Sequence, residues 1–333
     1  MSFTGPLLTV GEEAAGTATT LVGTSKIPYH IEFTLPIAGD VNVNAMSGGL
    51  PLGSANNGQK LSTSTAAYAG SHTAVLEPAT PAGSSVPAGA GWATANISSM
   101  GILTLVGRLG DGTTFTTALS PDGESNPGYR LFVQPYLPVR TQSFLAGSFT
   151  LAEHPIPGRR YLAQSNLTWK KSALPADSSY RTTFGPVNTV MMIDPWLPPK
   201  TTAAVITLAT RLSLTGGSIS LGVSHSDTGS ASQINLPTRL GLSATNAVIV
   251  LTPLANPTKW KTLTFVPTTG TFTGSFELSD LVSGKTVKRP VTFSGILRQP
   301  ASMTDPLIGE GHYLLPPLSG TEKTTGEVLL TRP

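Results

Sequence analysis

The chain has 333 residues, of which 39% are hydrophobic and 12% charged, so it can bury a large core while carrying about half the usual share of charge. No apolar run approaches the ~20 residues that a spanning helix needs, and we expect no membrane span. The net charge of +3 is scattered, and Lys and Arg never cluster beyond pairs such as Lys170 and Lys171, so we expect solvated charges and no nucleic-acid surface.

Alternation of apolar and polar residues begins early in the chain and predicts β-strands. Over residues 29–35 the apolar side chains occupy every second position, while His30 and Glu32 lie on the opposite face. Pro36 then ends the ladder, because proline has no N–H to donate. Residues 48–65, rich in Gly, Ser, Asn and Thr, indicate a long loop.

The strongest hairpin signal lies near the middle of the first half. Residues 102–109 and 113–119 both favour strands, and Gly110, Asp111 and Gly112 separate them. Glycine adopts positive φ without a Cβ clash, which makes Asp-Gly a typical hairpin turn. We therefore predict an antiparallel hairpin over residues 102–119.

Turn-forming residues separate the remaining strand candidates. These candidates are residues 129–133, 144–151, 203–214, 218–223, 247–252, 260–266, 271–278, 287–297, 312–315 and 327–331. Many short strands with no helical periodicity predict an all-β protein, either an antiparallel barrel or a pair of packed sheets built from sequential hairpins.

The domain organisation has two interpretations. A single large β domain over residues 1–333 is one, and two β halves over residues 1–195 and 201–333, divided at an irregular Pro-rich segment, is the other. We also expect the strand near residues 3–10 to pair with the strand near residues 327–331, because closing a sheet protects its edges.

A short motif of aromatic, hydroxyl and glycine residues occurs inside three strand-like runs. It reads Phe3-Thr4-Gly5, Phe272-Thr273-Gly274 and Phe293-Ser294-Gly295. Glycine within a strand usually marks a bulge, a bend or a close backbone approach. The repetition predicts that one bent hairpin is used more than once.

Several of these runs resemble modules that are repeated in very large exported proteins of Verrucomicrobia and related bacteria. The similar segments are residues 107–115, with the pattern G-x-L-x-D-G-T-x-F, residues 270–276, residues 291–297 and the terminal residues 326–330. The resemblance covers most of residues 68–330 and implies an extracellular, all-β module found beside adhesion-type or surface-anchored regions. It implies no catalytic residue. The first residues lack a charged segment followed by an apolar one, so we expect no secretory signal here; a module trimmed from a longer chain would look the same.

Three of the five histidines lie two positions from a carboxylate. The pairs are His30 with Glu32, His225 with Asp227, and Glu310 with His312. On a strand such residues share one face about 7 Å apart, and imidazole with carboxylate is a ligand set that zinc and related metals prefer. A barrel that gathers these strands at its mouth would hold a divalent metal, with His72 and His154 as further ligands. The alternative is that these residues are polar faces of strands that meet water, with residues 224–229 forming a turn.

Other chemistry has little support in the sequence. No cysteine is present, which excludes disulfides, thiolate metal sites and a cysteine nucleophile. Motifs for a nucleophile elbow, a zinc protease or a phosphate-binding loop are missing, so we assign no catalytic residue and no cofactor beyond that metal. Of the four tryptophans we expect at least two in the core and Trp196 exposed, as a carbohydrate-binding module would require.

The sequence thus favours a non-catalytic structural or adhesive β module of a bacterial exported or surface protein. Its partners would be other modules of a longer chain or a surface polysaccharide. The alternatives are a metal-dependent hydrolase, esterase-like or phosphoesterase-like, and a carbohydrate-binding module. An enzyme would need at least three of the His and carboxylate side chains to converge beside a pocket.

Overall fold

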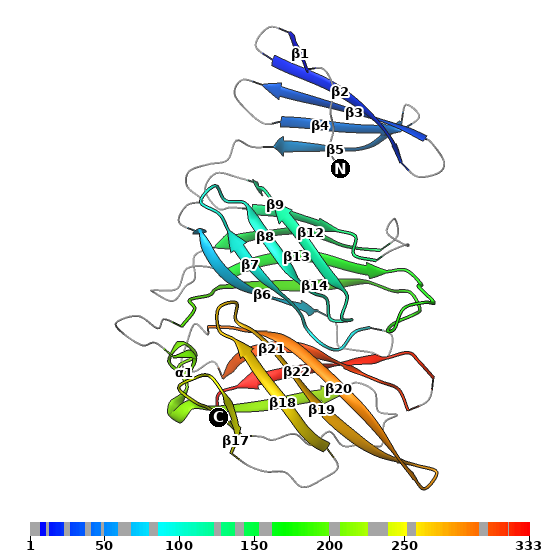
Figure 1. Cartoon of the computed structure of the whole chain (residues 1–333). Helices are drawn as coiled ribbons and strands as arrows, with labels where there is room; N and C mark the ends of the chain where they lie inside the picture. The colour runs from blue at the N-terminus through cyan, green and yellow to red at the C-terminus, as the bar shows by residue number, and fades with distance from the viewer. Residues whose placement is uncertain are drawn as a thin grey trace.

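The computed structural model confirms the all-β, antiparallel class. It describes the backbone of the strands at 7–10, 13–22, 27–36, 41–47 and 50–58, and residues 68–79, 86–122, 128–136, 143–152, 162–199, 207–225, 239–251, 258–299, 306–318 and 320–333. Their strands form three sheets of five, nine and eight strands. The sheets follow one another in chain order from top to bottom of Figure 1.

The five-stranded sheet is a simple meander of neighbouring antiparallel strands. Its strands are β1 (Leu7–Val10), β2 (Glu13–Val22), β3 (Ile27–Pro36), β4 (Val41–Ser47) and β5 (Leu50–Gly58). The strand predicted over residues 29–35 lies inside β3. The loop predicted over residues 48–65 is wrong for β5, where backbone pairing with β4 outweighs the low strand propensity of Gly, Ser and Asn.

The nine-stranded sheet closes on itself into a barrel-like shape. Its strands are β6 (Gly70–Pro78), β7 (Gly91–Ile97), β8 (Leu103–Arg108), β9 (Thr114–Leu119), β10 (Pro121–Asp122), β11 (Gly128–Val133), β12 (Phe144–Ala152), β13 (Leu162–Lys171) and β14 (Phe184–Pro195). The last strand, β14, pairs with the first, β6, and the sheet stays open only between β9 and β10. Here β9 approaches β11, and the Tyr129 hydroxyl donates to the Gly101 carbonyl at 2.9 Å.

The eight-stranded sheet repeats this connectivity. Its strands are β15 (Ser218–His225), β16 (Leu240–Leu242), β17 (Val248–Val250), β18 (Thr258–Val266), β19 (Thr271–Val282), β20 (Lys285–Leu297), β21 (Leu307–Leu315) and β22 (Thr324–Thr331). Again the last strand, β22, pairs with the first, β15, and the open edges, β17 and β18, are consecutive strands.

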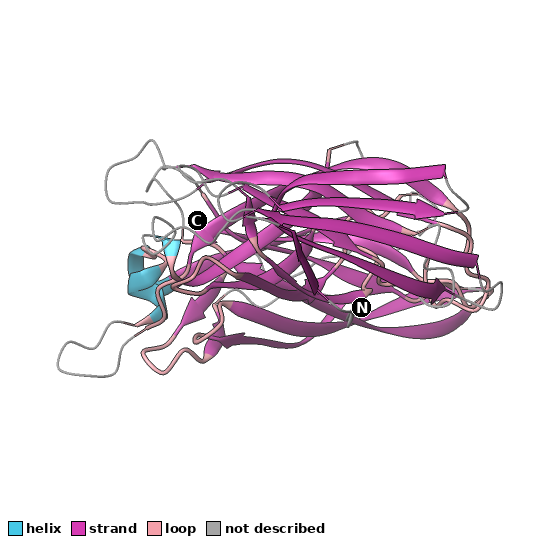
Figure 2. Ribbon diagram, turned by 90° about the horizontal axis from the view of Figure 1, so that it is seen from above, coloured by secondary structure: helices cyan, strands magenta, loops and turns pink. Residues whose placement is uncertain are grey.

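A one-turn helix, α1 (Leu208–Arg211), precedes this sheet. We predicted a strand over residues 203–214, and that prediction is wrong for residues 207–214. The Thr207 hydroxyl accepts a hydrogen bond from the Thr210 N–H at 3.2 Å, which caps a helical turn that the apolar pattern did not indicate. Seen from above, the axes of the strands are roughly aligned, and the helix lies at one end of them (Figure 2). Among the described helices, none has the length and hydropathy of a membrane-spanning segment.

The expected pairing of the two ends of the chain is wrong. Strand β1 pairs with β2 in the five-stranded sheet, whereas β22 lies between β15 and β21. Among the described strands, none pairs with a strand of another sheet, so the two ends of the chain do not protect each other's edges. The chain passes from the nine-stranded to the eight-stranded sheet between Pro195 and Ser218, and its division into one domain or two stays a prediction.

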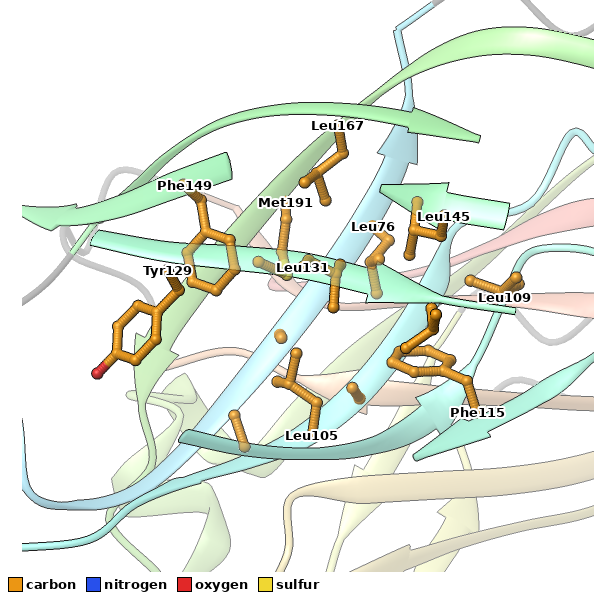
Figure 3. Close-up of a cluster of buried hydrophobic side chains, with 14 of the residues drawn as sticks. Leu76, Leu105, Leu109, Phe115, Tyr129, Leu131, Leu145, Phe149, Leu167 and Met191 are labelled. Atoms are coloured by element: carbon orange, nitrogen blue, oxygen red, sulfur yellow. The ribbon is translucent and has the colours of Figure 1, made fainter. Parts of the chain in front are cut away.

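Each of the two larger sheets encloses its own apolar core. In the nine-stranded sheet, alternate residues of each strand point inward, and Leu105, Leu131, Leu145 and Leu167 are almost completely buried (Figure 3). The predicted hairpin is confirmed between β8 and β9. The Asp111 side chain accepts a hydrogen bond from the Thr113 N–H at 3.0 Å, and Gly112 has a φ of 88°.

The core of the eight-stranded sheet depends on pairs of aromatic residues and glycines. Phe272 lies opposite Gly295, and Gly274 opposite Phe293, in the β19–β20 pairing. A Cβ added at either glycine would collide with the facing phenylalanine ring. The close-approach interpretation of these glycines is therefore confirmed. The prediction that the motif marks a repeated hairpin is wrong for these two copies, because they lie on the paired strands of a single hairpin. The third copy, residues 3–5, lies outside the described residues.

Candidate functional site

The two larger sheets pack against each other through β6 and β7 on one side and β20 and β21 on the other; we call this contact the sheet interface. Val75, Ala90 and Ile296 form its small apolar cluster, and all three are at most 3% exposed. The Trp92 indole N–H donates to the Ser294 hydroxyl at 3.1 Å across the interface. Buried apolar and polar contacts thus join strands that are far apart in sequence.

A charged cluster also spans the sheet interface. Arg298, which follows β20, donates to Asp194 of β14 and to Glu310 of β21, each at 2.8 Å. Glu310 is 1% exposed, and Glu77 of β6 shares a hydrogen bond with it. Two carboxyl groups, one from each sheet, therefore bind one guanidinium, and a third lies against Glu310, in a place where ions are costly unless paired.

The position of Glu310 in this cluster changes its pKa. Burial, together with the hydrogen bond and the charge of Glu77, raises the pKa of Glu310 to about 8, against the opposing effect of Arg298. Glu310 is therefore mostly protonated at neutral pH. A protonated Glu310 can donate to Glu77 while accepting from Arg298, so both of its oxygens have partners.

His312 lies two positions further along β21, on the same face as Glu310, as the sequence predicted. It is 2% exposed, and its Nδ1 lies 2.9 Å from the Ala90 carbonyl oxygen. Burial lowers the pKa of His312 to about 4, so the neutral ring donates from Nδ1 to that carbonyl. The backbone of Gly89 lies so close that a Cβ there would collide with His312.

The shared face of Glu310 and His312 meets protein, so the alternative that they face water is wrong for this pair. Strand alternation places two side chains on one face, but only the packing of the two sheets determines what that face meets. His72 of β6 is also buried, at 3% exposure, with Nδ1 2.9 Å from the Gly70 carbonyl oxygen. Burial lowers the pKa of His72 as well.

The other predicted metal ligands are divided between sheets. His30 and Glu32 lie on β3 of the five-stranded sheet, and His225 is the last residue of β15. The side chains of these three residues, together with Asp227 and His154, lie outside the described part of the structure. Among the side chains that the structure does describe, no group of three or more His, Asp and Glu residues is arranged to hold a metal ion. The metal site stays a prediction.

A second buried polar cluster, which the sequence did not indicate, lies at one end of the nine-stranded sheet. Lys171, at the end of β13, is 0% exposed, and its Nζ lies 2.6 Å from Asp177, 2.8 Å from the Ser179 carbonyl oxygen and 3.7 Å from Asp111. We call Asp111, Tyr136, Lys171 and Asp177 the lysine cluster. The prediction that Lys171 is a solvated charge is wrong. Lys171 continues the alternation that points Leu167 and Trp169 into the barrel. This pattern is the sequence signal that could have predicted its burial.

Trp196, the tryptophan that we expected to be exposed, is buried. It is 2% exposed, and its indole N–H donates to the Pro267 carbonyl oxygen at 3.1 Å. The segment around it is irregular in sequence because it links the two larger sheets, and the packing between them covers the ring. The expected placement of at least two tryptophans in the core is met by Trp169 and Trp196.

Comparisons with protein-family models, with curated proteins and with solved structures give no match.

Chemically, the sheet interface is suited to holding two sheets together. Arg298 pairs with carboxyl groups of both sheets, and the Trp92 indole pairs with the Ser294 hydroxyl across the contact. A depression of about 620 Å³ lies elsewhere, on strands β11 to β13. It is lined by Gly128, Tyr129, Arg130, Gly147, Ser148, Phe149, Thr150 and Asn166.

The raised pKa of Glu310 predicts a pH dependence of stability that Glu310→Gln removes. Between the ordinary value of 4.5 and about 8, folded Glu310 holds a proton that the unfolded chain releases, so its contribution to the free energy of unfolding falls as pH rises. His312, lowered from 6.5 to about 4, acts in the opposite sense between those values. From pH 6.5 to 8, therefore, Glu310 contributes a decline of at most ~1.4 kcal/mol per pH unit.

Urea unfolding of the wild-type protein and of Glu310→Gln across this pH range measures that decline. The difference between the two free energies of unfolding should shift steadily with pH. A difference that is constant from pH 6.5 to 8 would contradict the raised pKa of Glu310.

Proposed function

We propose that this chain is a non-catalytic structural or adhesive β module of a bacterial exported or surface protein. The observation that carries the proposal is the sheet interface. There two ionisable groups whose pKa values burial shifts strongly, Glu310 and His312, are buried in contacts between two barrel-like sheets. Groups buried in this way favour one specific arrangement of the two sheets, which is what a structural module requires.

The resemblance of residues 107–115 to repeated modules of exported bacterial proteins supports the same proposal. That hairpin supplies Asp111 to the lysine cluster, so its Asp-Gly turn has a packing role in addition to reversing the chain. The partners that we propose are further modules of a longer chain and surface polysaccharide. Location outside the cell or on its surface is part of the proposal.

A carbohydrate-binding role is the second candidate, because one outer sheet face combines exposed aromatic and polar side chains. Phe132 on β11 is 60% exposed and stacks on Phe144 of β12, with ring centroids 6.5 Å apart. Arg130, Ser148 and Asn166 line the neighbouring depression. Apolar rings beside hydrogen-bonding groups suit a sugar, which offers both C–H faces and hydroxyls.

Fractionation and protease treatment of intact producing cells test the leading proposal. We expect the protein in the surface or secreted fraction, and we expect external protease to remove it. Recovery only from the cytosol would contradict the proposal. A glycan array carried out on the same protein, with Phe132→Ala as the control, tests the carbohydrate role.

The hydrolase alternative is tested separately with ester and phosphoester substrates. It requires turnover that a chelator abolishes and that both His30→Ala and His312→Ala remove. That outcome would replace the structural proposal. Loss of turnover in His312→Ala alone, with lowered stability, would report on the sheet interface instead.

A further inference from the structure

The lysine cluster places an amine against a carboxyl group in a dry environment. The side chains of Lys171 and Asp111 are both 0% exposed, and Nζ lies 3.7 Å from Asp111 Oδ2. A second carboxylate, Asp177, lies 2.6 Å from the same Nζ and is 20% exposed. The ring of Tyr136 lies under the amine, with Nζ 5.2 Å from its centroid.

The hydrogen bonds that Asp111 accepts are of the kind that would make its carboxyl carbon an electrophile. Thr113 donates its backbone N–H to Oδ1 at 3.0 Å, and Tyr136 donates its hydroxyl to Oδ2 at 2.8 Å. The Trp169 indole N–H donates in turn to the Tyr136 oxygen at 2.9 Å, which fixes the phenol in place. Burial raises the pKa of Asp111 above its ordinary value, against the charge of Lys171, and so favours the neutral acid.

We propose that Lys171 and Asp111 react after folding to form an intramolecular amide (isopeptide) bond, with Asp177 as the base. This inference is independent of the function proposed above. It rests on the combination of a buried amine, a buried carboxyl group with two donors on its oxygens, and a second carboxylate in contact with the amine. A buried ion pair alone would not require Thr113 and Tyr136 to donate hydrogen bonds to the Asp111 oxygens.

The reaction needs no oxidant and no co-reactant. Asp177 takes a proton from the Lys171 ammonium, and the free amine attacks Cγ of Asp111. The N–H of Thr113 stabilises the negative charge that develops on Oδ1. The new bond is Cγ–Nζ, and the bond that breaks is Cγ–Oδ2. Of the two protons that nitrogen loses, one leaves with the Oδ2 hydroxyl as water, and the other passes through Asp177 to solvent.

The bond would join parts of the nine-stranded sheet that are not neighbours. Asp111 lies in the turn between β8 and β9, whereas Lys171 ends β13, with β14, β6 and β7 between β13 and β8 in the sheet order. A covalent link there would hold the end of the barrel shut across those strands. Such a link stabilises a fold by restricting the unfolded chain, as any long-range cross-link does.

Intact mass spectrometry of the purified full chain tests this proposal. We expect the folded wild-type protein to be lighter than its sequence by one water molecule, and a protease digest to contain a branched peptide joining Lys171 to Asp111. Lys171→Arg and Asp111→Ala should each have the full sequence mass. Asp177→Asn keeps both reacting groups but lacks the base, and it should also have the full mass or lose water much more slowly.

A matched control is Lys288→Arg, since Lys288 is also paired with a carboxylate, Glu277, at 3.6 Å, but is 68% exposed. This variant should still lack one water. Full sequence mass in folded wild-type protein overturns the proposal, and so does a branch mapped to any other pair. Because the wild-type mass and the digest decide the question, a variant that fails to fold does not leave it open.

Discussion

Arg298→Met is expected to lower the free energy of unfolding by ~3–5 kcal/mol, because it leaves a buried carboxylate without its partner. Asp194, whose side chain is 11% exposed, loses the guanidinium at 2.8 Å. Glu310 is mostly protonated at neutral pH and loses less. The cost should therefore grow as the pH rises past 8. Chemical denaturation at pH 7 and at pH 9 measures both effects.

The control for this prediction is an exposed pair. Lys261 lies 3.8 Å from Glu277 and is 40% exposed, so Lys261→Met should change the free energy of unfolding by less than ~1 kcal/mol. Replacing Arg298, Asp194 and Glu310 together by apolar residues should restore much of the lost stability, since the guanidinium and the two carboxyl groups that it binds are removed together. If Arg298→Met is as mild as Lys261→Met, the cluster does not hold the sheets together.

Gly295→Ala should destabilise the eight-stranded sheet by ~1–3 kcal/mol or more, because the site has no room for a methyl group. The added Cβ would collide with the Phe272 ring and with the backbone oxygen of Glu310. The ring is fully buried and the oxygen belongs to a neighbouring strand, so neither can move freely. Thermal and chemical unfolding measure the loss.

Gly222→Ala on β15 is the matched substitution for this prediction. A Cβ at Gly222 meets its nearest atoms at 3.9 Å, an ordinary van der Waals contact. This variant should be neutral or slightly stabilising, because alanine restricts the unfolded chain more than glycine does. Equal losses in the two variants would show that any side chain at a strand glycine is harmful, and the pairing of ring and glycine would then explain nothing.

Local pattern determined much of the fold, and contacts between distant elements determined most of the rest. The alternation over residues 29–35 and the Asp-Gly turn at residues 111–112 each depend on neighbours in sequence, and both elements were predicted. The helical turn at Leu208–Arg211 was missed, because a hydroxyl cap decides the conformation there.

The candidate sites show the same limit. Strand alternation predicted that Glu310 and His312 share a face, and it also indicates that Lys171 points inward with Leu167. Strand alternation does not predict which residues those faces contact. Glu310 meets Glu77 because the two larger sheets pack together, whereas Lys171 meets Asp111 because the nine-stranded sheet closes. Register and sheet packing lie beyond what one sequence, read locally, can provide.

The closure of each larger sheet between its first and last strands has a mechanical consequence. In both sheets the chain enters and leaves at the same end of that strand pair: His72 lies opposite Pro195, and Ser220 lies opposite Thr331. A pull applied through the flanking chain would therefore load the antiparallel hydrogen bonds one after another, because they run perpendicular to the strands. The β6–β14 and β15–β22 pairings would separate one hydrogen bond at a time instead of resisting in shear. Under tension the first strand to detach from each barrel would be β6 or β14 in one and β15 or β22 in the other.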